Sequence, residues 1–224
     1  MDFTELVQTR RSVHEYSDQS IEEDTLQRIF KRTTLAPSGY NLQPWEFVAL
    51  REEESKERLK EVAYNQDHVV EADTSVIVLG STDLTRHSEA VFEDWLAKGY
   101  LPNNDVKESL INNVEKMNTM SKADKRTWTT RSTALAAMTL MFAAWDEGIA
   151  SCPMEGFDSE ALVETFDIPD EYEPVMLITL GYPAADTSDI ENERKGRRPV
   201  DDVVHYESFD PSSETTLLDP SADN

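Results

Sequence analysis

The stretch Ala36–Phe47, with the sequence APSGYNLQPWEF, constrains the local fold more than any other part of the chain. Pro37 and Pro44 fix their own φ angles and lack a backbone N–H donor, so the stretch cannot lie inside a helix. Gly39 permits a positive φ or a close approach by another group. The apolar run FVAL that follows predicts a strand over 47–50. The stretch is therefore a polar loop that enters a strand.

The polar side chains of this loop can bind a ligand, or they can only stabilise the loop itself. Ser38, Asn41 and Gln43 offer hydroxyl and amide groups that suit the polar edge of a planar ring. The same residue types are common in ordinary connections between a helix and a strand. Composition alone leaves both interpretations open.

The chain is strongly acidic, since 45 Asp and Glu residues against 21 Lys and Arg residues give a formal net charge of −24 at pH 7. The acidic residues are spread along the sequence rather than gathered in one tail. Such a charge repels nucleic acid and anionic membranes, so we expect neither as a partner. Dispersed acidity favours adaptation to high salt, as in a halophile; a very acidic protein of an ordinary organism is the alternative.

Cysteine content and length indicate the compartment and the number of domains. Cys152 is the sole cysteine, so no disulfide can form within the chain, and a reducing cytoplasm is expected. The start MDFTE has neither the basic region nor the apolar run of a signal peptide. The longest apolar-rich run, 134–145, is too short to span a bilayer. The length of 224 residues predicts one domain, over 1–207, followed by an acidic polar tail over 208–224.

Hydrophobic periodicity predicts helices that alternate with strands. Strands are expected over 47–50, 75–80, 175–181 and 203–206. Helices are expected over 2–9, 20–35, 54–64, 65–72, 126–148 and 159–165. The second helix starts at Ser20-Ile21-Glu22-Glu23, which has the pattern of a capping box, and Asp158 is placed to cap the last. Residues 82–124 are the least interpretable part of the sequence, apart from a polar helical stretch around Val106–Met120.

The helix Arg126–Gly148 is rich in Ala, Leu and Met on more than one face, so we expect it to be buried by the core and by a subunit interface. Gly148 is a natural terminator for it. Strands separated by helices around one long helix indicate an α+β sandwich. The seven glycines form neither a GxGxxG motif nor a Walker loop, so no dedicated dinucleotide site is expected.

Four short segments, in their order along the chain, resemble segments of the nitroreductase family of FMN-dependent oxidoreductases. They are RRS at 10–12, PSGYNLQPW at 37–45, PMEGF at 153–157 and KGR at 195–197. The resemblance covers nearly the whole chain, and the Pro-Trp loop is its most specific part. It implies a nitroreductase-like three-layer α/β/α sandwich with a mixed, mostly antiparallel sheet. It also implies an intertwined homodimer with shared active sites.

The resemblance implies that Arg10, Arg11 and Ser12 hold the FMN phosphate together with Lys195 and Arg197. Guanidinium groups match phosphate oxygens in geometry and charge. In a chain of net charge −24, several cations on one site would stand out. The alternatives are that the two arginines cap the first helix and that Lys195 and Arg197 lie on a solvated loop.

The resemblance also implies the contacts of the flavin ring. They are Pro37, Ser38, Asn41 and Gln43 from the opposite subunit, Asn65 and Gln66 at the pyrimidine edge, and Pro153, Met154, Glu155 and Gly156 along the other face. The backbone of Glu155 and Gly156 is expected near the flavin N5, and no catalytic acid or base is predicted. His14 stands where the family usually has Arg or Lys near N1; a surface position beside Glu15 is the alternative.

These expectations together predict an FMN-dependent oxidoreductase that uses NADH or NADPH in a ping-pong cycle to reduce nitroaromatic, quinone or similar electrophilic acceptors. A specialised relative that dehalogenates or processes flavin, and a flavin-binding protein without turnover, stay open as alternatives. Phe92, Trp95 and Tyr100 are candidates for a substrate lid or for ordinary core aromatics. No metal site is predicted, because the four histidines are dispersed along the sequence.

Overall fold

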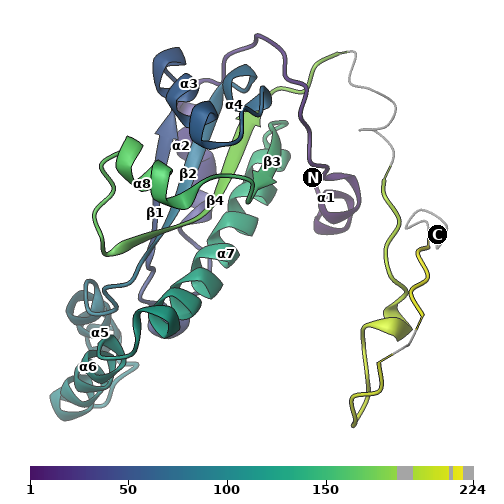
Figure 1. Cartoon of the computed structure of the whole chain (residues 1–224). Helices are drawn as coiled ribbons and strands as arrows, with labels where there is room; N and C mark the ends of the chain where they lie inside the picture. Colours follow the sequence, from purple (N-terminus) through teal and green to yellow (C-terminus); the bar gives the residue numbers. More distant parts are fainter. Residues whose placement is uncertain (186–193, 212–213, 219–224) are drawn as a thin grey trace. The chain divides into compact units, whose positions relative to one another are not determined.

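The computed structural model describes residues 1–185, 194–211 and 214–218, and the chain divides into two units, 1–185 and 186–224 (Figure 1). The first unit consists of α1 (Phe3–Thr9), α2 (Glu23–Thr33), η1 (Gly39–Asn41), β1 (Trp45–Leu50), α3 (Glu53–Val62), α4 (His68–Glu71), β2 (Thr74–Ser81), α5 (Ser88–Ala97), α6 (Asn104–Asn118), α7 (Lys122–Asp146), β3 (Ala150–Met154), α8 (Ser159–Thr165) and β4 (Tyr172–Gly181). The second unit contains the 3₁₀ turn η2 (Val200–Asp202).

The four strands form one antiparallel sheet in the order β1-β2-β4-β3. The central strand β2 is buried at every residue, which agrees with its continuous apolar run. A parallel bridge between Ser12 and Ser151 adds the N-terminal segment at the β3 edge. The arrangement is therefore mixed and mostly antiparallel, as predicted.

Helices cover both faces of the sheet, and successive residues of each central strand point to opposite faces (Figure 1). On one face Val78 belongs to the same core cluster as Leu140 of α7. On the other face Ile77 clusters with Leu59 of α3 and Leu162 of α8. These contacts make three layers and confirm the predicted α/β/α sandwich of the α+β class.

The long helix α7 is buried along most of its length, as its apolar composition predicts. Leu140 and Ala144 are fully buried, whereas Leu135 is 49% exposed in the single subunit. The Ser121 hydroxyl accepts the Asp124 backbone N–H and caps the start of the helix. Gly148 has a φ of 77°, the left-handed conformation of a helix terminator, so this prediction is confirmed.

Two local predictions are wrong. The helix expected from Ser20 begins at Glu23, because the Ile21 N–H donates to the Asp73 carboxylate at 3.1 Å and holds the chain away from the helix. The strand expected over 203–206 is absent from the described residues of that segment. The Val204 N–H instead donates to the Val200 carbonyl at 2.9 Å, which closes a turn.

The strand β3 and the helix α5 had no counterpart in the prediction, whereas α6 agrees with the helical stretch expected around Val106–Met120. The strand β3 contains Pro153, which an edge strand tolerates because its outer side needs no ladder hydrogen bond. Residues 82–124 form α5 and α6, which pack around their own cluster with Phe92 and Val114 fully buried. Phe92 is thus a core aromatic, whereas Tyr100 is 76% exposed.

The described residues of the predicted tail, 208–211 and 214–218, are all exposed. Residues 212–213 and 219–224 of that tail lie outside the described residues. The predicted domain end at 207 stays a prediction beside the unit boundary at 185/186. In the described parts of the chain, no helix has both the length and the apolar character needed to cross a bilayer.

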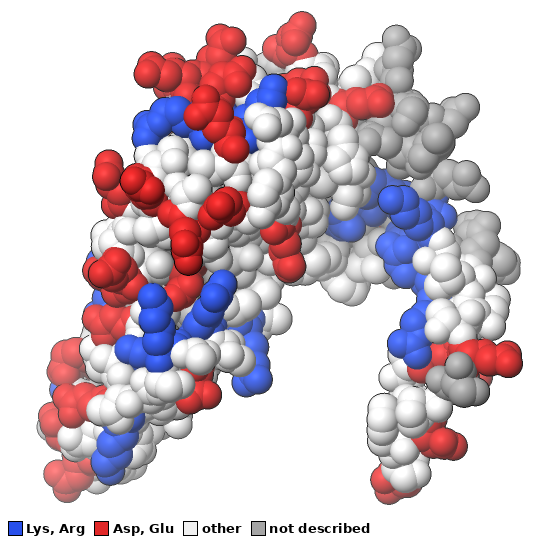
Figure 2. Space-filling model, viewed as in Figure 1, with Lys and Arg blue, Asp and Glu red and all other residues white. Residues whose placement is uncertain are grey.

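Acidic side chains are spread over the visible face of the first unit, from the region of α3 to that of α5 and α6, among uncharged and fewer basic side chains (Figure 2). We expect the melting temperature to rise from low salt to molar KCl. The Debye length falls from about 30 Å at 0.01 M to about 3 Å at 1 M, so salt removes repulsion between these charges. Thermal melts monitored by circular dichroism across a KCl series measure the effect.

A variant of α3 separates screening from a general salting-out effect. Glu54→Gln combined with Glu57→Gln and Glu61→Gln removes three exposed carboxylates without shortening any side chain. This variant should melt higher than the parent at low salt and gain less from KCl. A melting temperature independent of KCl in the parent would contradict the predicted adaptation to salt.

Candidate functional site

The predicted site segments 10–14 and 153–156 lie next to each other at the β3 edge of the sheet. The Val13 N–H donates to the Ser151 carbonyl at 3.2 Å, beside the Ser12–Ser151 bridge. β3 then leads directly into Glu155 and Gly156. Two segments far apart in the sequence are therefore held side by side by backbone pairing.

Tyr16 fixes the N-terminal segment to the central sheet. Its hydroxyl donates to the Val13 carbonyl at 2.7 Å and lies 2.7 Å from the Thr179 hydroxyl of β4. A Cβ on Gly181 would lie 2.6 Å from the Tyr16 ring, so the glycine makes room for it. The position of residues 10–14 thus depends on a buried contact with β4.

Gln66 joins this group from the turn between α3 and α4. Its side-chain NH₂ donates to the Gly156 carbonyl at 2.8 Å and to the Ala63 carbonyl at 3.0 Å. Tyr64 and Asn65 have φ angles of 53° and 57°, which residues other than glycine seldom adopt. Such conformations cluster at functional sites, where the surrounding structure stabilises them.

His14 faces the same group. Its Nε2 lies 3.3 Å from the Cys152 Sγ, and its ring meets the His68 ring edge-on with centroids 5.0 Å apart. The side chain therefore turns toward β3, although it remains exposed at its outer side. Its contact with the flavin N1 stays a prediction.

The predicted phosphate ligands divide between the two units. The Arg11 guanidinium donates through Nη1 to the carbonyls of Gln8, Thr9 and Arg10 at 2.8, 2.9 and 3.1 Å, so Arg11 caps the end of α1. This is the alternative role that the sequence allowed. It does not exclude a contact with phosphate, and the assignment of Arg10, Arg11 and Ser12 stays a prediction.

Arg197 lies in the second unit, in an antiparallel bridge with Leu218. Its Nη1 donates to the Lys195 carbonyl at 2.7 Å and to the Gly196 carbonyl at 3.1 Å. The guanidinium thus folds back on its own loop. The convergence of Lys195 and Arg197 on the first unit stays a prediction.

The loop 37–43 is tightly ordered by hydrogen bonds. The Gln43 N–H donates to the Ser38 hydroxyl at 2.9 Å, and the Gln43 side chain donates to the Asn41 carbonyl at 3.2 Å. Tyr40, Asn41 and Gln43 have φ angles of 53°, 56° and 48°. The loop therefore presents its polar groups in a conformation fixed before any ligand arrives.

Gly39 has a role different from the positive φ that it permits. Its φ is not positive, and its N–H donates to the Ser132 hydroxyl of α7 at 3.3 Å. A Cβ at this position would lie 2.8 Å from the Trp128 ring. The group that approaches closely is thus Trp128, so Gly39 seats the loop on α7.

Within one subunit, the loop 37–43 lies far from the group of predicted residues at β3, which consists of 10–14, Gln66 and 153–156. In the sheet register Met154 lies level with Val48, through Leu177 and Ile77. Trp45, which follows the loop, lies about 10 Å from Val48 along β1. β1 itself lies about 14 Å from β3, because three strand spacings separate them. The loop also packs on α7, whereas Met154 belongs to the layer of α3 and α8.

Two cavities adjoin Asn41 and were not foreseen from the sequence. One, of about 560 Å³, is lined by Trp95, Tyr100 and Leu101. The other, of about 360 Å³, includes His87. Apart from Asn41, the first is lined by residues of 82–124, whereas the second is also lined by Gln43 and Trp45. Within 82–124, the sequence signal for these cavities was the presence of Trp95 and Tyr100. Of the predicted lid aromatics, these two therefore border open space.

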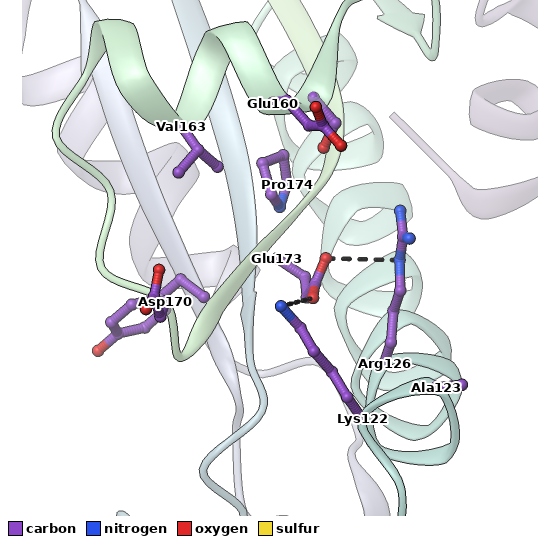
Figure 3. A pocket seen from close by; sticks show the side chains of 10 residues that line it. Lys122, Ala123, Arg126, Glu160, Val163, Asp170, Glu173 and Pro174 are labelled. Carbon is purple, nitrogen blue, oxygen red and sulfur yellow. Dashed lines mark ion pairs between the residues drawn. The ribbon is translucent and has the colours of Figure 1, made fainter.

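A separate cavity of about 610 Å³ lies between α7, α8 and the start of β4 (Figure 3). Glu173, which is 9% exposed, lies 3.5 Å from Lys122 and 3.5 Å from Arg126. The two cations compensate the charge of a nearly buried carboxylate. None of the predicted site residues lines this cavity.

The sequence profile of the nitroreductase family matches residues 7–182, so the chain belongs to the nitroreductase family. It is 32% identical over 206 residues to the NAD(P)H nitroreductase MhqN of Bacillus subtilis, which covers 92% of this chain and 98% of that protein. The structure of the Bacillus subtilis nitroreductase ydfN superposes with a TM-score of 0.83 at 31% identity, over 91% of this chain and 98% of that one.

A nitroreductase from Exiguobacterium sibiricum, solved in complex with FMN, superposes with a TM-score of 0.81 at 26% identity, over 92% of this chain and 98% of that one. The family consists of oxidoreductases, and the chain is therefore an oxidoreductase. The predicted family, fold class and enzyme class are confirmed.

The close contact at Gly39 gives a test of the loop. Gly39→Ala should lower the free energy of unfolding by about 1–3 kcal/mol, because the added methyl group overpacks the contact with Trp128. Urea denaturation measures this loss.

The matched control is the same substitution in a Trp128→Leu background. The loss should be smaller there, since leucine lacks the ring atoms that the methyl group would meet. Equal losses in the two backgrounds would show that Trp128 is not the reason for the glycine.

Proposed function

We propose that this chain is an FMN-dependent NAD(P)H oxidoreductase of the nitroreductase type that reduces nitroaromatic, quinone or similar electrophilic acceptors. The observation that carries the proposal is the group formed at β3 by residues 10–14, Gln66 and Gly156. FMN, when bound, supplies the transfer of hydride from NADH or NADPH to the acceptor. The FMN complex of the relative from Exiguobacterium sibiricum supports the same cofactor here.

The residues at β3 have the chemistry that a flavin ring requires. Both amide hydrogens of Gln66 are used on Ala63 and Gly156, so its carbonyl oxygen is the group that would accept the ring N3–H. A Cβ on Gly156 would lie 3.2 Å from the Gln66 Nε2, so the glycine lets the Gln66 amide lie close to the backbone that would face the ring. Asn65 would assist Gln66 at the pyrimidine edge, and Pro153, Met154 and Glu155 would line the adjacent face.

The phosphate would be held by Arg10, Ser12, Lys195 and Arg197. Arg11 would add positive charge and, through its cap of α1, keep the segment in place. His14 would stand near N1, where negative charge develops on reduction and a donor stabilises it. Its approach to Cys152 supports a position at the site rather than beside Glu15.

We further propose a homodimer in which each site uses both subunits. The proposal is supported by the separation of the loop 37–43 from the β3 group, on different faces of one subunit. Leu135 on α7 is a large apolar side chain that a partner would cover. The loop of one subunit would then bring Asn41 and its adjoining cavities to the β3 group of the other, where Trp95 and Tyr100 suit a planar acceptor.

The acidic composition and the single cysteine favour a salt-rich cytoplasm as the setting.

The proposed activity is tested on purified protein in molar KCl. The protein should be yellow, and NADH or NADPH should bleach it without oxygen. A nitroaromatic, a quinone or an activated alkene should then restore the colour, and halogenated acceptors test the specialised alternative. Yellow protein that NAD(P)H does not bleach would favour a flavin-binding protein without turnover.

The phosphate assignment has a direct control, because riboflavin lacks the phosphate. Arg197→Ala should weaken FMN binding about tenfold to a hundredfold, since a charge-assisted hydrogen bond contributes roughly 1.5–3 kcal/mol. Riboflavin affinity should stay close to that of the parent, as measured by quenching of flavin fluorescence. Equal weakening of both ligands would assign Arg197 to folding instead.

The shared site is tested by mixing two defective chains. One carries Arg10→Ala and Ser12→Ala, and the other carries Ser38→Ala and Asn41→Ala. Each homodimer should bind FMN poorly, whereas random mixing should restore about a quarter of the sites, because half of the dimers are mixed and each has one intact site.

The matched control mixes Arg10→Ala chains with Ser12→Ala chains, whose defects lie in the same group. Every site in the mixed dimers then still carries one of the two defects, so mixing should restore no FMN binding. Differently tagged chains verify that mixed dimers form. Mixed dimers that gain no FMN binding over the two parents would rule out sites shared in this way.

A further inference from the structure

Four side chains that commonly bind metals meet beside the N-terminal segment and β3. The ligand atoms of His14, His68 and Cys152 all lie within 4.8 Å of one another. The His14 Nε2 lies 3.3 Å from the Cys152 Sγ, and the His68 Nε2 lies 2.9 Å from the Met154 Sδ. The four residues come from three segments that are distant in the sequence.

These distances are close to those of a tetrahedral metal site. Metal bonds of about 2.3 Å to sulfur and about 2.0–2.1 Å to nitrogen place neighbouring ligand atoms roughly 3.5 Å apart. The contact between His14 and Cys152 already has this length, and the ligand atoms of His14, His68 and Cys152, all within 4.8 Å of one another, would close by at most about 1.3 Å. The His68 Nε2 and the Met154 Sδ, 2.9 Å apart, would separate slightly.

The burial of the four groups also suits an ion that enters from solvent. Cys152 and Met154 are 4% and 6% exposed, so the sulfur atoms lie in the interior. His68 is half-buried and His14 is exposed, so the imidazoles lie toward the solvent side. A site for a soft ion needs this protection of sulfur together with a path of entry.

We propose that His14, His68 and Cys152, with Met154 as a fourth ligand, bind a thiophilic d¹⁰ cation, Zn²⁺ or Cu⁺. Thiolate, thioether and imidazole ligands select such ions over Mg²⁺ or Ca²⁺. On binding, the Cys152 thiol releases its proton to solvent and the thiolate coordinates the ion, with no change of oxidation state. The ion would lie next to the β3 group proposed for the flavin, so its occupancy would bear on the same site.

Carboxylates are the main competing ligands, because the chain has 45 acidic residues. A test must therefore report sulfur coordination, which carboxylates cannot produce. Co²⁺ replaces Zn²⁺ in tetrahedral sites and gives a thiolate-to-metal charge-transfer band. Because Cys152 is the sole cysteine, such a band identifies its ligand without further assignment.

The experiment titrates the purified protein with Co²⁺ in molar KCl and records difference spectra against the flavin background. We expect one Co²⁺ per chain with a thiolate band, which Zn²⁺ then abolishes. In a second arm, Cu⁺ held by bicinchoninate is offered to the protein, and transfer bleaches the chromophore. If Zn²⁺ displaces Co²⁺ but the protein takes no Cu⁺ from bicinchoninate, the site is one for zinc. If the protein takes Cu⁺ but Zn²⁺ does not displace Co²⁺, the site is one for copper.

Variants locate the site. Cys152→Ser should remove the band, and His68→Ala should weaken binding by more than the roughly 10- to 100-fold that loss of an outer-shell partner costs. Glu54→Gln removes an exposed carboxylate of α3 outside the cluster and should leave the titration unchanged. Circular dichroism confirms that each variant is folded. Absence of a thiolate band in the parent, or equal Co²⁺ affinity in parent and Cys152→Ser, would overturn the proposal.

Discussion

The structure depends first on the burial of β2 between two layers of helices. Every residue of β2 is buried, and both of its edges are paired. Gly80 lets α7 approach closely, because a Cβ there would lie 2.7 Å from the Thr129 hydroxyl. The register of β2 with β1 and β4 then determines where β1 begins and where β3 ends. Those two places carry the loop 37–43 and the β3 group, so the packing of one strand fixes the geometry of both halves of the proposed site.

The sequence was sufficient for elements whose pattern and burial agree. β2, β4 and α7 were predicted because a continuous apolar run or a broad apolar face has one simple structural explanation. β3 was missed because Ser-Cys-Pro is a poor strand sequence, and its pairing with β4 comes from tertiary context. The capping box at Ser20 failed for a similar reason: the long-range hydrogen bond from Ile21 to Asp73 outweighs the local pattern.

The sequence supported a set of candidate site residues, which stays a prediction, but not their geometry. Family resemblance pointed to the segments around Arg10, Asn41 and Gly156, and the sheet pairing explains why the first and third lie together. No local pattern could reveal that Gly39 serves the contact with Trp128. The cluster of His68 with Cys152 was likewise invisible, because residues that are dispersed in sequence become neighbours only through the packing of α4 on β3. Proximity of this kind is a property of the fold.

The net charge of −24 makes the proposed chemistry depend on short-range contacts. FMN phosphate and NAD(P)H are anions, and at low salt the field of the whole chain opposes their approach. At 1 M salt the Debye length is about 3 Å, which suppresses this repulsion but leaves directly contacting charge pairs much less affected. Cations placed in direct contact with a phosphate therefore retain most of their effect under conditions where long-range attraction has little. If the chain binds FMN and NAD(P)H as proposed, salt would act twice: it would relieve repulsion within the fold, and it would admit these anions to a site whose selectivity depends on contact geometry.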